Sequence, residues 1–217
     1  MKSLAEKTEE ILDGMIIRYP VLRACRTEIQ QSFEALAQCY LNGGKVLVCG
    51  NGGSAADAEH IVAELMKGFL KKRELSSVLK NALRERDPET GNVLAVKLQN
   101  SLPAISLTFN TTLNTAFAND VDPDLVFAQQ VLGYGKKGDI LIGISTSGNA
   151  KNVYNALFTA KTLGLKCIGL TGQSGGKMAV LCDIIIKVPN TITPEIQELH
   201  LPIYHTLCAM LEENFFC

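Results

Sequence analysis

The chain has 217 residues, of which 47% are hydrophobic and 20% are charged, and its formal net charge at pH 7 is −1. Because basic and acidic residues are mixed and nearly balanced, the charge pattern excludes an electrostatic nucleic-acid footprint. No apolar run approaches the ~18 residues of a membrane span, and the charged N-terminus lacks a signal-peptide core. The seven cysteines form no CxxC pair, which is typical of reduced thiols. We therefore expect one large domain in a soluble, cytoplasmic protein without nucleic-acid or membrane partners.

The first 44 residues predict two amphipathic helices. Apolar residues recur at helical spacing over 3–17 and 22–41, Pro20 separates the two segments, and Gly43-Gly44 ends the second. No strand precedes these helices, so no local sheet is available to cover their apolar faces. We therefore expect residues 1–44 to serve oligomerisation by packing in a helical bundle with partner subunits.

From residue 45 onward, short apolar strands alternate with helices. This alternation is typical of a parallel sheet that helices cover on both faces. It predicts, for residues 45–217, an α/β domain with a doubly wound parallel five-stranded sheet in a three-layer, flavodoxin-like or Rossmann-like sandwich. The expected strands are 45–49, 103–108, 139–145, 166–171 and 183–188. The expected helices are 54–69, 111–119, 122–132, 149–163, 175–181 and 195–215.

Residues 70–101 interrupt this alternation. The segment is charged and predicts one helix over 75–86, a turn at Asp87-Pro88 and a shorter second element. It follows the helix 54–69, so we interpret it as an insertion near the mouth of the site described next. Two interpretations stay open: a solvated helical hairpin, or a lid that helps to select the substrate.

Two turns have the composition of anion sites. Gly50 to Ser54 is rich in glycine and lies between a buried strand and a helix, where backbone N–H groups and the helix dipole favour an anion. Ser145-Thr146-Ser147-Gly148 follows another buried strand. Ser and Thr also serve as ordinary helix N-caps, but three hydroxyls in a row exceed what capping needs. Because ligands bind at the carboxyl ends of strands in open α/β sheets, we predict that both turns bind phosphate.

The three histidines lie in two of the predicted helices. His60 and Glu64 are four residues apart and share a helix face. Gln197 and His205 are separated by about 80° around a second helix, whereas His200 lies about 140° from His205 and is expected to face elsewhere. If the two faces meet, the four side chains could hold a divalent zinc. Alternatively, Glu64 and His205 could flank a substrate as base and acid, and spacing alone does not choose.

Five motifs between residues 45 and 215 occur together: GNGGSAADAEHIVAEL, ANDVD, GISTSGNAKNV, LTGQSGGKMA and EIQELHLPIYHTLC. Because these motifs occur in the same order in the SIS (sugar isomerase) domain family, the chain resembles that family, and specifically the phosphoheptose isomerases. The resemblance implies interconversion of sedoheptulose 7-phosphate and D-glycero-D-manno-heptose 7-phosphate by enediol proton transfer. It also implies one zinc per active site and a homotetramer whose active sites lie between subunits.

The resemblance further implies a role for each matching residue. Glu64 and His205 correspond to the catalytic acid–base pair. The zinc-associated positions correspond to His60, Glu64, Gln197 and His205. We expect the phosphorylated sugar to contact Asn51, Gly52, Gly53, Ser54, Asn119, Asp120, Ser145, Thr146, Ser147 and Gln197.

Three departures from the family pattern concern the substrate. Ala150 stands where the family often has another phosphate-contacting serine, Pro194 stands where some members carry an acidic residue, and segment 70–101 is longer than in compact members. They leave a SIS isomerase or lyase for another sugar phosphate as an alternative. A second alternative is a non-catalytic SIS-type scaffold that binds a replication initiator. The combination of Glu64, Gln197 and His205 argues against the scaffold, which does not need it.

Overall fold

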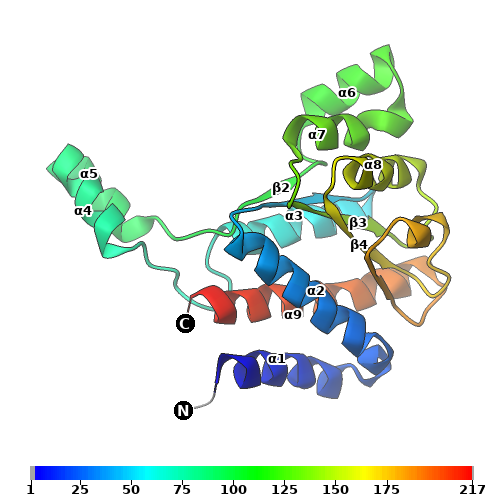
Figure 1. Cartoon of the computed structure of the whole chain (residues 1–217), viewed down its shortest axis with the longest axis horizontal. Helices are drawn as coiled ribbons and strands as arrows, with labels where there is room; N and C mark the ends of the chain where they lie inside the picture. Colours follow the sequence, from blue (N-terminus) through cyan, green and yellow to red (C-terminus); the bar gives the residue numbers. More distant parts are fainter. Residues whose placement is uncertain (1–2, 217) are drawn as a thin grey trace.

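The computed structural model describes residues 3–216, and its centre is a five-stranded parallel sheet with the strand order β2-β1-β3-β4-β5 (Figure 1). Every pair of neighbouring strands is parallel, which confirms the predicted sheet. The strands are β1 (Val46–Cys49), β2 (Ala104–Ser106), β3 (Ile140–Ser145), β4 (Lys166–Thr171) and β5 (Ile184–Lys187).

Helices cover both faces of this sheet. The α-helices are α1 (Leu4–Arg18), α2 (Arg26–Leu41), α3 (Gly53–Met66), α4 (Ser77–Arg86), α5 (Pro88–Lys97), α6 (Thr111–Asp120), α7 (Val126–Tyr134), α8 (Lys151–Thr162) and α9 (Thr193–Phe215). The short 3₁₀ helices are η1 (Pro20–Cys25), η2 (Pro123–Leu125) and η3 (Lys177–Val180). Helices α2, α3 and α9 lie on one face with α1 outside them, and α7 and α8 lie on the other (Figure 1).

The apolar strands are explained by this double cover. In β3, Ile140, Ile142 and Ile144 belong to the core cluster shared with α2, α3 and α9. Leu141, between them, belongs to the cluster shared with α7 and α8. Successive side chains of a strand point to opposite faces, so a strand buried on both sides needs apolar residues at every position. The prediction of a three-layer sandwich is therefore confirmed.

The N-terminal helices find their cover within the chain itself. Helix α1 packs along α9, and α2 packs against α9 and β5. Phe33 and Leu36 are only 7% and 2% exposed as a result. The premise that these helices lack an internal surface was wrong, because the C-terminal helix, remote in sequence, supplies it. Their role in oligomerisation stays a prediction, and it now concerns the exposed apolar side chains Leu4, Ile17, Val21 and Leu41.

The inserted segment forms a hairpin of α4 and α5 that projects from the body as an arm (Figure 1). The predicted turn at Asp87-Pro88 is the junction, where the Asp87 carboxylate accepts from the Thr90 N–H at 2.7 Å and caps α5. The second element is a full helix, longer than predicted. The arm packs mainly on itself, so the segment forms a helical hairpin, and a role as a lid stays a prediction.

One predicted helix is much shorter than expected. The segment 175–181 contains only the four-residue 3₁₀ helix η3. Gly175 and Gly176 both have positive φ values, 74° and 55°, which an α-helix does not allow. Residues 122–132 also begin with the 3₁₀ helix η2 before α7.

Two further expectations concern the chemistry of the whole chain. Among residues 3–216, no helix combines the length and the apolar character needed to cross a bilayer. The cysteines in this part of the chain are free; Cys182 is half-buried, and the buried ones are Cys25, Cys39, Cys49, Cys167 and Cys208.

Candidate active site

The two turns predicted to bind phosphate follow neighbouring strands. Strand β1 pairs with β3 in the middle of the sheet, so both turns emerge at its carboxyl edge. The Asn51 amide links them by exchanging hydrogen bonds of 2.8 and 2.9 Å with the Asn152 amide in the first turn of α8. Gly52 has a φ of 56°, which favours glycine, and α3 begins at the next residue. The Ser54 and Ala55 N–H groups donate to the Asn51 and Gly52 carbonyls, both at 3.0 Å, so the N–H groups of Gly52 and Gly53 are the ones left for an anion at this edge.

The second turn is braced by the loop that follows β4. Gly148 has a φ of 66°, and its N–H donates to the Ser145 carbonyl at 3.0 Å. The Thr146 carbonyl accepts from the Gly172 N–H at 3.0 Å. Ser145 is buried, Thr146 is half-buried and Ser147 is exposed. The turn is thus held in one shape while its hydroxyls differ in access to solvent, which suits it to present donors to an anion.

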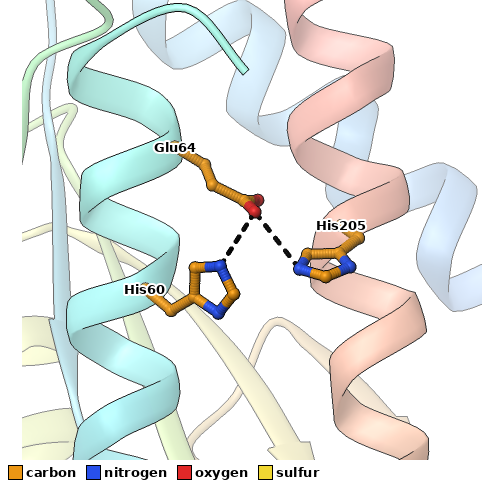
Figure 2. A group of neighbouring side chains, drawn as sticks. All are labelled: His60, Glu64 and His205. Atoms are coloured by element: carbon orange, nitrogen blue, oxygen red, sulfur yellow. Dashed lines mark ion pairs between the residues drawn. The ribbon is translucent and has the colours of Figure 1, made fainter. Parts of the chain in front are cut away.

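A cluster of ionisable side chains lies between α3 and α9 (Figure 2). Glu64 Oε1 is 3.1 Å from His60 Nε2 and 3.2 Å from His205 Nε2. Glu64 is 4% exposed, whereas the two imidazoles are partly open to solvent. The two helix faces considered from the residue spacing do meet, and they bring one carboxylate between two imidazoles.

Burial sets the protonation of this cluster. Removal from water raises the pKa of Glu64, although the neighbouring His60 opposes the shift. Burial, followed by the proximity of His60, lowers the pKa of His205. A carboxylate that is easier to protonate and an imidazole that stays neutral are suited to exchange protons with a substrate near neutral pH.

Two residues that the sequence interpretation missed orient His60. The Tyr204 hydroxyl donates to Asp57 Oδ1 at 3.2 Å and lies 3.1 Å from His60 Nδ1. Because the hydroxyl has only one hydrogen and donates it to Asp57, His60 Nδ1 is the donor to Tyr204, and the ring is held with Nε2 facing Glu64. The signal was present in the sequence: Asp57 lies three residues before His60 on the same face, and Tyr204 precedes His205.

The cluster has the donor set of a metal site. One ligand atom from each of His60, Glu64 and His205 lies within 4.8 Å of the others. His205 Nε2 is near Glu64 but is not oriented for a hydrogen bond, and among the described residues it has no hydrogen-bond partner. Glu64 Oε2 meets no nitrogen or oxygen donor there, and the carboxylate is approached only by the weak donor of the Cys208 thiol. Buried polar atoms that face one another without a strong donor are costly, and a shared cation would satisfy them. The residues present therefore fit a divalent ion.

Gln197 lies at the other end of the α3–α9 contact. A Cβ atom on Gly53 would lie 2.5 Å from Gln197 Nε2, so the amide touches the first residue of α3. His60 is seven residues further along that helix, about 10 Å away along its axis. The structure thus places Gln197 beside the first phosphate turn. His200 is fully buried and does not belong to the cluster, in line with the prediction that it faces elsewhere.

Asn119 and Asp120 lie elsewhere in this chain. They end α6, where the Asn119 amide donates to the Asp120 carboxylate at 2.8 Å and both side chains are exposed. Helix α6 packs mainly on η2 and α7, on the face of the sheet opposite α9. Asn119 and Asp120, which were expected to contact the sugar, therefore do not lie near the cluster around Glu64 of the same chain.

Known proteins similar to this chain were found by sequence and by structure. A sequence model described as "SIS domain" matches residues 20–95 and 86–172. The phosphoheptose isomerase of Desulfovibrio desulfuricans is 40% identical over 209 residues, which are 96% of this chain and 87% of that protein. The phosphoheptose isomerase of Aneurinibacillus thermoaerophilus is 41% identical over 216 residues, which are 100% of this chain and 94% of that protein.

The structural comparison points the same way. The phosphoheptose isomerase GmhA from Neisseria gonorrhoeae superposes with a TM-score of 0.72 and 33% sequence identity, covering 97% of this chain and 99% of that one. A phosphoheptose isomerase from Francisella tularensis gives the same TM-score and identity, with 98% and 99% covered. The likeness thus extends over the whole chain.

Proposed function

The chain belongs to the phosphoheptose isomerases of the SIS domain family, and we propose that it interconverts sedoheptulose 7-phosphate and D-glycero-D-manno-heptose 7-phosphate. The observation that carries this proposal is the buried Glu64 carboxylate between the imidazoles of His60 and His205, on the helix that begins at a glycine-rich turn. A proton-transfer group and an anion site on one element suit an aldose–ketose isomerase acting on a sugar phosphate.

The reaction moves one proton between C1 and C2 of the sugar through a cis-enediol. Glu64 acts as the base that takes the proton from one carbon, and its raised pKa brings it closer to the pH at which a general base is effective. The proton that Glu64 takes is returned to the neighbouring carbon, directly or relayed through His205, whose lowered pKa leaves it neutral and able to accept it; both side chains thus return to their starting protonation states.

The cofactor proposed for this site is zinc, which His60, Glu64 and His205 would hold; Gln197, expected as a fourth ligand, lies beside Gly53 at the phosphate end of α3. The nitrogen and oxygen donors of the cluster and its unsatisfied buried atoms support this choice. When bound, the ion supplies a Lewis acid next to the carbonyl and hydroxyl oxygens of the substrate. The carbon-bound proton is still handled by the two protein side chains.

The phosphate and the sugar hydroxyls bind at the carboxyl edge of the sheet. Ser145, Thr146 and Ser147 offer hydroxyls there, and Gly52 and Gly53 offer N–H groups at the start of α3, next to Ser54. The side chains of Asn51 and Gln197 lie at the same edge and complete the polar lining.

The enzyme works as a homotetramer with active sites between subunits, in the cytoplasm. Support for the assembly comes from Asn119 and Asp120, which lie away from the cluster in one chain, so a neighbouring copy is needed to bring them to it. Exposed apolar side chains on the N-terminal helices, such as Ile17 at 76% exposure, offer surface for such contacts. Free buried thiols suit a reducing compartment.

A panel of ketose phosphates, incubated with the purified protein in the presence and absence of a chelator, tests the proposal. We expect conversion of sedoheptulose 7-phosphate to an aldose, with activity reduced by the chelator and restored by zinc. Conversion of a different sugar phosphate would reassign the substrate. A protein that binds phosphosugars but turns none of them over would favour the scaffold alternative.

A further inference from the structure

The largest fully buried side chain in the described part of the structure is a charged one. Arg73 is 1% exposed and lies just beyond α3, at the stem of the α4–α5 arm. An arginine is rarely buried unless all its donors are engaged, so its partners indicate what it fixes.

Arg73 closes the end of α3. Its Nη2 donates to the Glu64 carbonyl at 2.9 Å, and its Nη1 donates to the Leu65 carbonyl at 2.7 Å. These are among the last carbonyls of the helix, which have no partner within it. The residue after the helix, Lys67, is extended, so no glycine cap serves this end. A guanidinium at a helix C-terminus is also favoured by the helix dipole.

The third donor of Arg73 connects to α9. Its Nε donates to Glu212 Oε1 at 2.8 Å, in an ion pair whose side chains are 0% and 1% exposed. Glu212 also accepts from three successive backbone N–H groups, those of Phe69, Leu70 and Lys71, at 2.7 to 2.9 Å. Burial opposes its ionisation, but the hydrogen bonds from Phe69 and Arg73 outweigh burial and lower the pKa of Glu212. The carboxylate is therefore charged and fully occupied.

Glu212 thereby reaches the second member of the acid–base pair. It lies seven residues after His205, on the same face of α9. By holding the backbone of Phe69 it fixes a ring that lies 5.5 Å, centroid to centroid, from the imidazole of His205 at an interplanar angle of 40°. This separation is within the range of favourable aromatic contact.

We propose that Arg73 and Glu212 are the positioning residues of the acid–base pair. Arg73 fixes the backbone of Glu64 at the end of α3, and Glu212 fixes the Phe69 ring against His205. Neither side chain touches the substrate; one buried ion pair sets the distance between the two helices that carry the reacting groups. The inference rests on the proposed isomerase function and adds to it the residues that hold its geometry.

Arg73→Lys and Glu212→Gln test the proposal. A lysine can still pair with Glu212, but it cannot donate in three fixed directions. We expect kcat for sedoheptulose 7-phosphate to fall about 10-fold or more while KM stays within about 2-fold, because the phosphate turns lie at the opposite end of α3. Glu212→Gln keeps the shape of the side chain but loses its charge, and it should also lower kcat while leaving KM nearly unchanged.

Leu157→Ala is the matched control for stability alone. Leu157 is fully buried in the other core cluster, against α7 and the far face of the sheet. Its truncation should lower Tm, yet kcat should stay native. A second readout does not depend on turnover: the ring signals of His205 in NMR spectra, assigned with His205→Gln, should shift in Glu212→Gln and stay in place in Leu157→Ala, because the neighbouring Phe69 ring moves only in the former.

The outcomes separate the two proposals. Wild-type protein that isomerises no sugar phosphate removes the proposed function, while the His205 signals still decide whether the ion pair positions that ring. Native kcat in both variants, or unshifted His205 signals in Glu212→Gln, overturns the positioning role. If Arg73→Lys does not fold, Glu212→Gln decides alone.

Discussion

The contact between α3 and α9 and the arm formed by α4 and α5 meet at Arg73, yet they are built in opposite ways. In the contact, the charged side chains of Glu64, Arg73 and Glu212 are each at most 4% exposed. In the arm, the apolar side chains Val78 and Val96 are 78% and 65% exposed. Charged side chains are thus buried in the α3–α9 contact, where they fix the positions of the reacting groups. Apolar side chains are exposed in the arm, which positions no group of the site.

We expect the arm to be the less stable of the two regions. Its helices have ten residues each, a length that is marginal without packing. They meet closely at one point, where a Cβ atom on Gly91 would lie 2.1 Å from the Leu83 carbonyl oxygen. The α3–α9 contact instead belongs to the main core cluster. Substitutions in the contact should therefore change activity or global stability, and substitutions in the arm should change neither.

The largest effect is expected for Glu64→Gln. Glutamine has nearly the same shape but cannot accept the carbon-bound proton, so turnover should fall by ~10²-fold or more while the fold and phosphosugar binding are retained. Steady-state kinetics, with circular dichroism and a binding assay on the same preparation, measure this. Near-native turnover would remove Glu64 from the mechanism.

A pH-dependent effect on stability is expected from His200. This residue of α9 is fully buried, and burial lowers its pKa to about 4 from an ordinary value of about 6.5. Between these two pH values His200 binds a proton in the unfolded chain but not in the folded chain. The contribution of neutral His200 to the free energy of unfolding, fully present above pH 6.5, is therefore lost as pH falls towards 4. The loss is on the order of 3 kcal/mol.

The variant His200→Leu isolates the contribution of His200 to the pH dependence of stability. Leucine has a similar size and does not titrate, so urea unfolding of the variant should depend less on pH between 6.5 and 4 than that of the wild type. Carboxylates titrate in both proteins, and the difference between the two curves removes their contribution. Parallel curves would show that His200 is not the group responsible.

The fold could be predicted from the sequence because its signals are local. Apolar strands such as Ile140–Ser145 and the turn at Gly52 need only periodicity and the conformational freedom of glycine to be recognised. The segment 175–181 was overpredicted for the same reason, since helical spacing does not reveal that Gly175 and Gly176 adopt positive φ.

The site could be predicted only in part. The i,i+4 spacing of His60 and Glu64 indicated a shared face, but no periodicity connects Arg73 with Glu212, which is 139 residues away in sequence. Likewise, the cover of Phe33 and Leu36 comes from α9 and could not be seen within the first 44 residues. Tertiary partners of this kind follow from how the sheet brings distant helices together.

A local effect is expected for Gly91→Ala in the arm. The new Cβ atom would meet the Leu83 backbone, which cannot swing aside as a side chain can, so α4 and α5 must separate. Amide hydrogen exchange in both helices and tryptic cleavage near Arg84 should accelerate, while Tm of the body changes little. Gly133→Ala in α7 is the control, because nothing lies within 4 Å of its Cβ position. If Gly91→Ala instead lowered the Tm of the whole protein, the arm would not unfold independently of the body.

The smallest effect is expected for Val96→Lys. Val96 is 65% exposed on α5, and lysine is at least as good a helix former, so the free energy of unfolding should change by no more than about 0.5 kcal/mol. Thermal melting and the activity assay measure this, with Val96→Thr as a matched control that keeps the shape but adds no charge. Sedimentation of both variants completes the test. If the charge alone disperses the assembly or abolishes activity, another chain covers this face, and the contrast between a buried contact and a free arm holds only for the isolated chain.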